Sequence, residues 1–211
     1  MSRITAFIHL TLDGVMQAPG RPDEDCRDGF EHGGWAMHYN DADQAKAVGQ
    51  SMANTGAILL GRRTYEDFYQ VWPKRTDSPF SAILNNTLKY VASRTLTEPL
   101  PWMNSKLLDG NAEDTVAELR QQPGKDIVIL GSGMLVQSLL RHNLIDELML
   151  TIHPIVLGAG SRLFPDGGAP TTLRLVDSTA TSKGVIIARY QPVETPAHGK
   201  ESVRLAMATQ P

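Results

Sequence analysis

Three short polar sequences stand directly behind runs of apolar residues, and they hold the side chains most able to bind or transform a ligand. They are Gly61, Arg62, Arg63 and Thr64 after residues 57–60, Ser93 and Arg94 after residues 90–92, and Gly131, Ser132 and Gly133 after residues 127–130. Each apolar run predicts a buried strand. Glycine, hydroxyl and arginine groups collected past several strand ends are typical of a site for a multiply charged anion, most simply a phosphorylated nucleotide.

The first two sequences offer positive charge. Arg62, Arg63 and Thr64 begin a predicted helix, where free backbone N–H groups, the helix dipole and a guanidinium all favour a phosphate. The alternative interpretation is an ordinary helix start with surface arginines. Ser93 and Arg94 would suit a phosphate monoester, such as the 2′-phosphate that distinguishes NADP from NAD.

The third sequence lets the backbone approach a pyrophosphate closely, because glycine leads into a predicted helix. It is not the Gly-x-Gly-x-x-Gly pattern of a Rossmann domain, since Val136 stands where the last glycine would be. The sequence therefore excludes an ordinary Rossmann fingerprint.

Strands alternate with helices along most of the chain. We expect strands at 4–12, 57–60, 88–92, 127–130 and 145–152, helices at 41–54, 64–69, 112–121 and 133–141, and a long loop at 17–40. Shorter elements are expected at 78–86 and 106–108, and two strands at 173–177 and 184–190 end the pattern. This order predicts an α/β domain over residues 1–192, with a mostly parallel sheet closed by a C-terminal antiparallel hairpin. Residues 193–211 are expected to form a tail, with an edge strand or a partner contact at 203–207 as the alternative.

Composition limits the classes of partner. The chain has 211 residues, a formal net charge of −3 and 41% hydrophobic residues, so we expect one folded domain with no general attraction for nucleic acid or an anionic membrane. The single cysteine, Cys26, excludes an intrachain disulfide framework and is interpreted as an incidental thiol. The six histidines do not form a metal-ligand set. No apolar stretch approaches the ~18 residues that a membrane span needs, so the expected location is the cytoplasm.

The three strand-end sequences, in this order and spacing, resemble the NADPH-binding elements of the dihydrofolate reductase-like superfamily. Residues 12–16 and 150–166 are more similar to the RibD C-terminal domain family, the reductase part of bifunctional riboflavin-biosynthesis proteins. The resemblance covers residues 3–191 and implies a three-layer α/β/α fold with a mixed central sheet, NADPH as the cofactor and a homodimer. One cysteine cannot supply the zinc deaminase of the bifunctional proteins, so the resemblance is to a stand-alone reductase.

Carried over to this chain, the resemblance implies a set of residues that bind the cofactor. They are Gly14, Val15, Met16, Gly61, Arg62, Arg63, Thr64, Ser93, Arg94, Gly131, Ser132, Gly133 and Met134. For Met16 the alternative is plain core packing. In dihydrofolate reductases a cis peptide joins a glycine pair at the third element, and the matching pair here is Gly131 and Ser132.

Fewer residues are implied on the substrate side. Asp43 matches the region of the carboxylate that supports protonation in dihydrofolate reductases, with a helix cap as the alternative, and Asp13 is the other carboxylate expected near the cofactor. Thr151 matches a substrate-side threonine, with strand packing as the alternative. Trp35 and His38 belong to the 17–40 loop, which is interpreted either as a substrate wall or as a surface excursion anchored in the core.

The expected activity is NADPH-dependent transfer of hydride to a small heterocyclic or imine-like substrate. Family likeness points most specifically to a reductase of the 5-amino-6-(5-phosphoribosylamino)uracil type. Dihydrofolate reductase activity and a non-catalytic NADP-binding dimeric module are the alternatives.

Overall fold

An eight-stranded sheet runs through the part of the chain that the computed structural model describes, residues 1–168 and 170–193. Its strands are β1 (Ile4–Thr11), β2 (Thr55–Gly61), β3 (Leu88–Ala92), β4 (Ser105–Leu107), β5 (Asp126–Leu130), β6 (Glu147–His153), β7 (Leu173–Ala180) and β8 (Ile186–Pro192). The helices are α1 (Ala42–Met52), α2 (Arg62–Val71), α3 (Pro79–Asn86), α4 (Ala112–Gln121) and α5 (Gly133–Arg141). The strand order is β4-β3-β2-β5-β1-β6-β8-β7.

Parallel pairing dominates the sheet. β1 pairs in parallel with β5 and β6, β2 with β5 and β3, and β3 with β4. Only β8 runs against its neighbours β6 and β7 among the described strands. The predicted fold class, a mostly parallel α/β sheet closed by a C-terminal antiparallel hairpin, is confirmed. Parallel strands end at one edge, so the three polar sequences must gather there.

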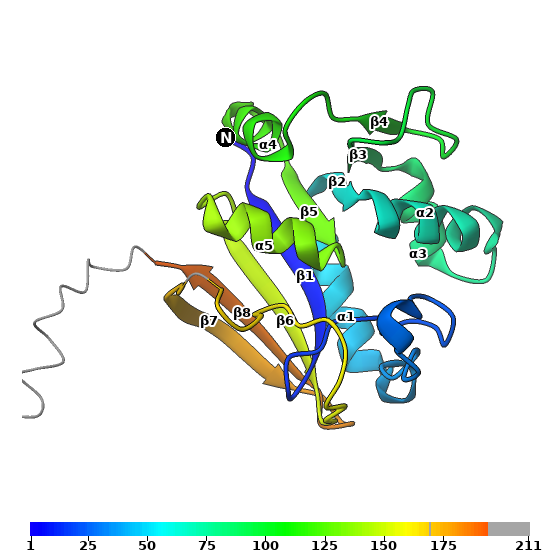
Figure 1. The fold of residues 1–211 in the computed structure, drawn as a ribbon, viewed down its shortest axis with the longest axis vertical. Helices are drawn as coiled ribbons and strands as arrows, with labels where there is room; N and C mark the ends of the chain where they lie inside the picture. The colour runs from blue at the N-terminus through cyan, green and yellow to red at the C-terminus, as the bar shows by residue number, and fades with distance from the viewer. Residues whose placement is uncertain (169, 194–211) are drawn as a thin grey trace, which may run out of the picture.

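Helices cover both faces of this sheet (Figure 1). α4 and α5 pack on one face, where Val116 and Leu139 join the larger apolar core. α1, α2 and α3 pack on the other face through Met52, Tyr65 and Leu84. The result is the three-layer α/β/α arrangement that the resemblance implied.

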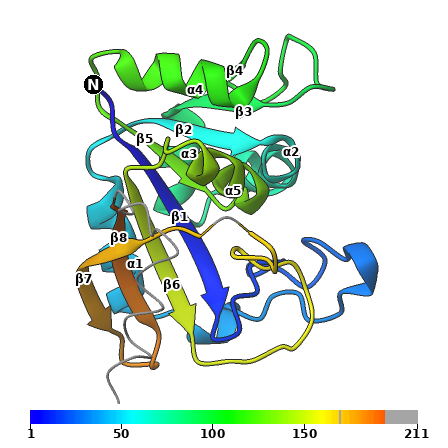
Figure 2. The same cartoon turned by 60° about the vertical axis from the view of Figure 1, so that its left-hand side comes forward.

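The N-terminus of α1 is fixed to the turn between β7 and β8. Asp41 caps the helix by accepting a hydrogen bond from the backbone N–H of Gln44 at 2.8 Å. The same carboxylate accepts from the Ser182 hydroxyl at 3.2 Å. Figure 2 shows this turn at the same end of the molecule as the carboxyl ends of β1 and β6. The start of α1 therefore borders the edge at which the parallel strands end.

The structure also moves some predicted boundaries. α2 begins at Arg62 rather than at residue 64, because Gly61 is extended and takes the N-cap position while both arginines are already helical. The 17–40 loop contains two short 3₁₀ turns, Arg27–Gly29 and Met37–Tyr39. The predicted tail lies outside the described residues from 194 onward. No helix in the described part of the chain is long and apolar enough to cross a membrane.

Candidate functional site

The N-termini of α2 and α5 are joined by two hydrogen bonds between the first and third polar sequences. The backbone N–H of Gly61 donates to the Ser132 hydroxyl at 3.0 Å, and the backbone N–H of Ser132 donates to the Thr64 hydroxyl at 3.2 Å. Neither helix has a side-chain hydrogen bond at its N-cap. Two helix dipoles and their free N–H groups therefore converge where an anion could bind.

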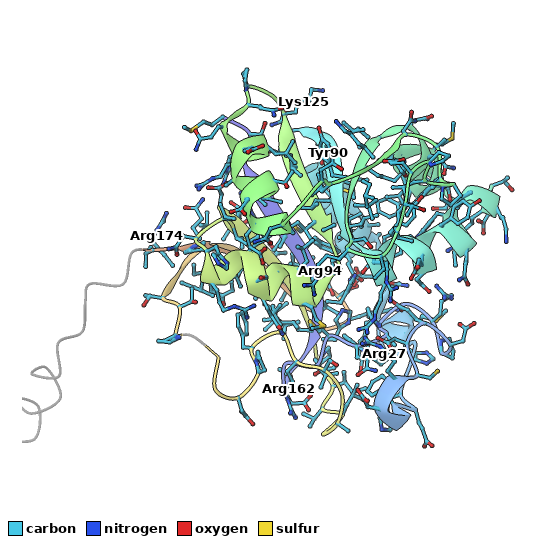
Figure 3. All side chains as sticks on the ribbon, turned by 45° about the horizontal axis from the view of Figure 1, so that its top comes forward. Arg27, Tyr90, Arg94, Lys125, Arg162 and Arg174 are labelled. Carbon is cyan, nitrogen blue, oxygen red and sulfur yellow. The ribbon has the colours of Figure 1, made fainter. Side chains whose placement is uncertain are left out.

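The arginines of the first and second polar sequences lie near one another, because β2 and β3 are paired up to their carboxyl ends. Arg62 donates from Nη1 to the Thr95 hydroxyl at 3.0 Å, which ties α2 to the segment after β3. The Ser93 hydroxyl accepts from the backbone N–H of Thr95 at 3.1 Å and so shapes this turn. Arg63 and Arg94 are exposed and make no ion pair within the described residues. In the view of Figure 3 Arg94 lies over the N-terminal end of α5, and it follows β3, whose Ala92 is paired with Gly61 at the end of β2.

The backbone at the start of α5 is left-handed at two residues and is in close contact with Met16 at a third. Gly131 and Ser132 have positive φ values of 56° and 50°. A Cβ added to Gly133 would lie 1.9 Å from the sulfur of Met16, so this thioether rests directly against the glycine. Met16 is therefore placed beside the third polar sequence, and it also packs against the larger apolar core, as the alternative interpretation expected. The peptide between Gly131 and Ser132 is trans, and Glu98–Pro99 is the cis peptide found among the described residues.

Ser132 offers a test of this junction. Ser132→Ala removes the acceptor for the Gly61 N–H but keeps a Cβ at positive φ, so we expect the free energy of unfolding to fall by about 1–2 kcal/mol and NADPH binding to weaken. Ser132→Gly also loses the hydroxyl but relieves the left-handed strain of about 1 kcal/mol. Urea unfolding should therefore place Ser132→Gly between Ser132→Ala and the unmutated protein. Equal stability of all three proteins would contradict the described junction.

Asp13 is held as a carboxylate by the loop after β6. It accepts from the Thr11 hydroxyl at 2.6 Å and from the backbone N–H groups of Leu157 and Gly158 at 3.2 and 2.8 Å. These hydrogen bonds, with that from Thr11 the largest cause, lower the pKa of Asp13 to about 2. Arg162 adds a longer ion pair at 3.6 Å. A group that is ionised above about pH 2 has no proton to give at neutral pH, so the geometry disfavours Asp13 as the proton donor and assigns it to loop anchoring.

The lowered pKa predicts an acid-dependent loss of stability. Because the pKa of folded Asp13 is about 2 and the ordinary value is 3.8, its contribution is complete above about pH 4 and is lost as the pH falls toward 2. Asp13→Asn should therefore lower the free energy of unfolding by about 2 kcal/mol at pH 7, and by much less near pH 2.5. Urea unfolding at both pH values checks this, with the exposed Asp109→Asn as the control. A difference that stays constant with pH would contradict the assignment.

The other proposed carboxylate, Asp43, lies at the surface. It occupies the first turn of α1, and its Oδ2 accepts from the backbone N–H of Ser182 at 3.4 Å. Its neighbour Gln44 is buried instead, and it shares a helix face with Val48 and Met52, which pack toward the sheet. The i, i+4, i+8 spacing of these three residues is the sequence signal that could have placed Gln44 on the buried face of α1. The structure thus turns an uncharged amide, rather than a carboxylate, toward the sheet.

Polar side chains of β1 and β6 line the sheet face that α1 covers. The register pairs His9 with Thr151 and Thr11 with His153, and neighbouring paired residues point to the same face. His9 Nδ1 lies 3.0 Å from His153 Nε2, within hydrogen-bond distance. Burial, together with the adjacent imidazole of His153, lowers the pKa of His9, and burial lowers that of His153 to about 4. Both imidazoles are therefore neutral at pH 7.

Several buried polar atoms on this face have no hydrogen-bond partner within the described structure. They are both amide atoms of Gln44, the hydroxyl of Thr151 and Nδ1 of His153. A buried polar atom left unpaired costs about 1–3 kcal/mol, so a ligand that supplied the missing partners would be favoured. We call Gln44, Thr151, His9 and His153 the polar wall.

The 17–40 loop covers the polar wall. The rings of Trp35 and Tyr39 meet His153 edge-on at 5.2 and 5.4 Å, and the Trp35 indole donates to the backbone of Gln17 at 2.7 Å. The loop's other end is fixed to α2, where the Arg21 guanidinium makes two hydrogen bonds to Asp67. The loop thus reaches from the middle of α2 to the polar wall, and the buried Trp35 anchors it in the core.

His38 is not brought to the polar wall. Its side chain is exposed, and its backbone carbonyl accepts from Lys183 Nζ at 2.9 Å. Among the described residues, no group of three or more His, Cys, Asp or Glu side chains is arranged to hold a metal ion.

Comparisons with known proteins agree with this geometry. The chain is 33% identical over 135 residues to the uncharacterized protein YyaP of Bacillus subtilis, covering 61% of this chain and 70% of YyaP. A putative riboflavin biosynthesis protein from Shewanella sp. PV-4 has a similar structure, with a TM-score of 0.64 and 22% identity over 91% of this chain and 99% of that one. Dihydrofolate reductase from Enterococcus faecalis, solved with NADP(H), gives a TM-score of 0.54 and 16% identity over 91% and 97% of the two chains.

The sequence pattern of the RibD C-terminal domain family matches residues 2–187, which is nearly all of the structure described above. The solved neighbours establish the dihydrofolate reductase-like fold, and the family match agrees with the strand-end sequences that first indicated it. The chain belongs to the RibD C-terminal domain family.

Proposed function

We propose that this protein is an NADPH-dependent reductase that transfers hydride to a small heterocyclic or imine-like substrate. The observation that carries this proposal is the junction of two uncapped helix N-termini, α2 and α5, beside the unpaired side chain of Arg94. Such a junction suits a pyrophosphate, and an extra arginine suits a further phosphate.

The residues present fit the cofactor. Thr64, Ser132 and the backbone of Gly133 and Met134 would hold the pyrophosphate, with the Met16 side chain resting against the Cα of Gly133 at the start of α5. Arg62, Arg63 and Arg94, with Ser93, would hold the adenosine 2′-phosphate. Gly14, Val15 and Met16 would border the nicotinamide. When bound, NADPH supplies a hydride.

The polar wall supports an uncharged substrate. Gln44 presents a donor and an acceptor side by side, and Thr151 and His153 add further neutral groups. An amide of this kind matches an N–H and C=O edge, as in a uracil ring, whereas a carboxylate would be needed to pair with a protonated amidine-like edge. This supports the 5-amino-6-(5-phosphoribosylamino)uracil type of substrate over dihydrofolate.

A non-catalytic NADP-binding module is the second candidate. One observation favours it, because neither carboxylate expected to act as the proton donor is suited to that role. Asp13 is ionised above about pH 2, and Asp43 lies at the surface. A reduction still needs a proton, and in this arrangement a water molecule would have to supply it, because His9 and His153 are neutral at pH 7.

The direct test is consumption of NADPH in the presence of candidate substrates. We expect turnover with the phosphoribosylaminouracil compound and little with dihydrofolate or simple pterins. Gln44→Leu, which removes both unpaired amide atoms, should abolish turnover without weakening NADPH binding. Tight NADPH binding without turnover of any of these substrates would favour the non-catalytic module, and turnover of dihydrofolate alone would overturn the substrate assignment.

A further inference from the structure

The imidazoles of His9 and His153 form a chain of two rings within the polar wall. His9 Nδ1 lies 3.0 Å from His153 Nε2, so one proton lies between these two atoms. Both rings are neutral at pH 7, because burial lowers the pKa of each. A neutral imidazole has one proton on its two nitrogens. The pair therefore holds two protons, one between the rings and one on an outer nitrogen, which is either His9 Nε2 or His153 Nδ1.

No described group fixes the outer proton to one end of the pair. Within the described residues His9 Nε2 has no hydrogen-bond partner, and His153 Nδ1 is buried without one. A carboxylate or a backbone carbonyl on the second nitrogen is what usually sets the tautomer of a histidine. Neither ring has such a partner in this part of the chain, so the pair can change from one arrangement of its protons to the other.

The two ends of the pair differ in their access to a ligand. His9 is half-buried, whereas Gln44 is 4% exposed and Thr151 and His153 are 0% exposed. His9 is therefore the member of the polar wall that a ligand can contact without a rearrangement. At the other end, the rings of the 17–40 loop lie edge-on against His153, so that water reaches its Nδ1 only when this loop moves.

We propose that His9 and His153 form a proton relay, in which His9 Nε2 protonates the nitrogen of the substrate's C=N bond and His153 returns a proton to His9. This inference rests on the proposed reductase function. Because His9 is the accessible end and its Nδ1 is already bonded to His153, Nε2 is the atom left to face the substrate. Water is the source of the proton, and the pair carries it across the polar wall.

The relay balances protons and electrons. Hydride adds to the carbon of the C=N bond, the π electrons move to the nitrogen, and the nitrogen takes the proton of His9 Nε2. His9 Nδ1 takes the shared proton from His153 Nε2, while His153 Nδ1 takes a proton from water and leaves hydroxide. Both rings are neutral before and after this step, with their tautomers exchanged. The reverse shift, again with water, resets the pair between turnovers.

The test is single-turnover oxidation of NADPH by the full chain with the phosphoribosylaminouracil compound. His9→Ala and His153→Ala should each lower the rate about a hundredfold or more, with the Kd for NADPH unchanged. Added imidazole should restore at least about tenfold of this loss. Added 1-methylimidazole should restore none, because it has nearly the same shape but one blocked nitrogen and cannot pass a proton from one side to the other. His142→Ala, which removes an exposed histidine at the end of α5, should keep the full rate.

A second measurement needs no substitution and no substrate. Nitrogen-15 NMR of the histidine rings in the unmutated full chain with NADPH at pH 7 should show two neutral rings and one proton shared by His9 Nδ1 and His153 Nε2. Two unprotonated facing nitrogens would overturn the relay. This result decides the question if either alanine variant fails to fold, which its thermal unfolding shows.

The outcomes also separate the relay from the reductase function. A full rate in either alanine variant, or equal rescue by imidazole and 1-methylimidazole, would overturn the relay and leave the reductase in place. Equal rescue would mean that the rings only fill space. No turnover by the unmutated protein would overturn the proposed function, and the relay with it.

Discussion

Arg94→Ala is expected to remove most of the preference for NADPH over NADH. Arg94 is exposed and unpaired in the described structure, beside the junction of α2 and α5, whereas Arg62 already bonds Thr95 and lies 3.8 Å from Glu66. A guanidinium that meets a phosphate makes a strong, charge-assisted contact. We expect the NADPH affinity to fall at least about tenfold, or about 1.4 kcal/mol, while the NADH affinity is unchanged.

The measurement is stabilisation against thermal unfolding by each cofactor over a range of concentrations. Arg141→Ala is the matched control, because Arg141 is also exposed but stands at the other end of α5 and changes the net charge equally. An equal loss of NADPH and NADH binding in Arg94→Ala would mean that Arg94 contacts a phosphate common to both cofactors. No loss at all would remove it from the site.

Thr151→Val is expected to make the protein more stable and less active. The Thr151 hydroxyl is fully buried without a partner in the described structure, and valine keeps the β-branched shape that suits β6. Removing an unpaired buried hydroxyl should raise the free energy of unfolding by about 1 kcal/mol and the Tm by about 2–4 °C. If the hydroxyl contacts the substrate, kcat/KM should fall at least about tenfold.

Thr55→Val is the control that separates the expected gain in stability from the expected loss of activity. The Thr55 hydroxyl is likewise a buried, unpartnered atom, but it stands at the start of β2, far along the strand from the polar sequence at the carboxyl end. This variant should gain similar stability and keep full turnover. A Thr151→Val protein that is stabilised yet fully active would show that Thr151 serves packing alone, which was the alternative interpretation of its sequence.

The elements with clear local signals could be predicted from the sequence. The bounds of α4 and α5 agree with the expected 112–121 and 133–141, because amphipathic spacing and a Pro-Gly or glycine boundary define each helix. The start of α2 was placed two residues late, since Gly61 has no side chain to mark a cap. The meeting of the first and third polar sequences was predictable, because parallel strands end at one edge and each strand carried its own polar sequence.

The substrate side could be predicted less well, because its residues meet only through the register of distant strands. His9 and His153 come together because β1 and β6 pair with Thr11 opposite His153, and no local pattern encodes that register. The role of Asp13 depends on two backbone N–H groups more than 140 positions away in the sequence. From the sequence, the carboxylate of Asp43 was chosen and its neighbour Gln44 was not considered. The helical spacing of Gln44 with Val48 and Met52 nevertheless predicted that Gln44 lies on the apolar face of the helix.

The central claim is that the junction of α2 and α5 binds NADPH, and calorimetric titration of the unmutated full chain tests it most directly. NADPH and NADH are titrated separately at one ionic strength, because phosphate contacts weaken with salt. The account predicts saturable binding of both with at least about tenfold higher affinity for NADPH. Equal affinities would contradict the assignment of the 2′-phosphate to Arg62, Arg63 and Arg94, and no binding of either would contradict the cofactor site itself.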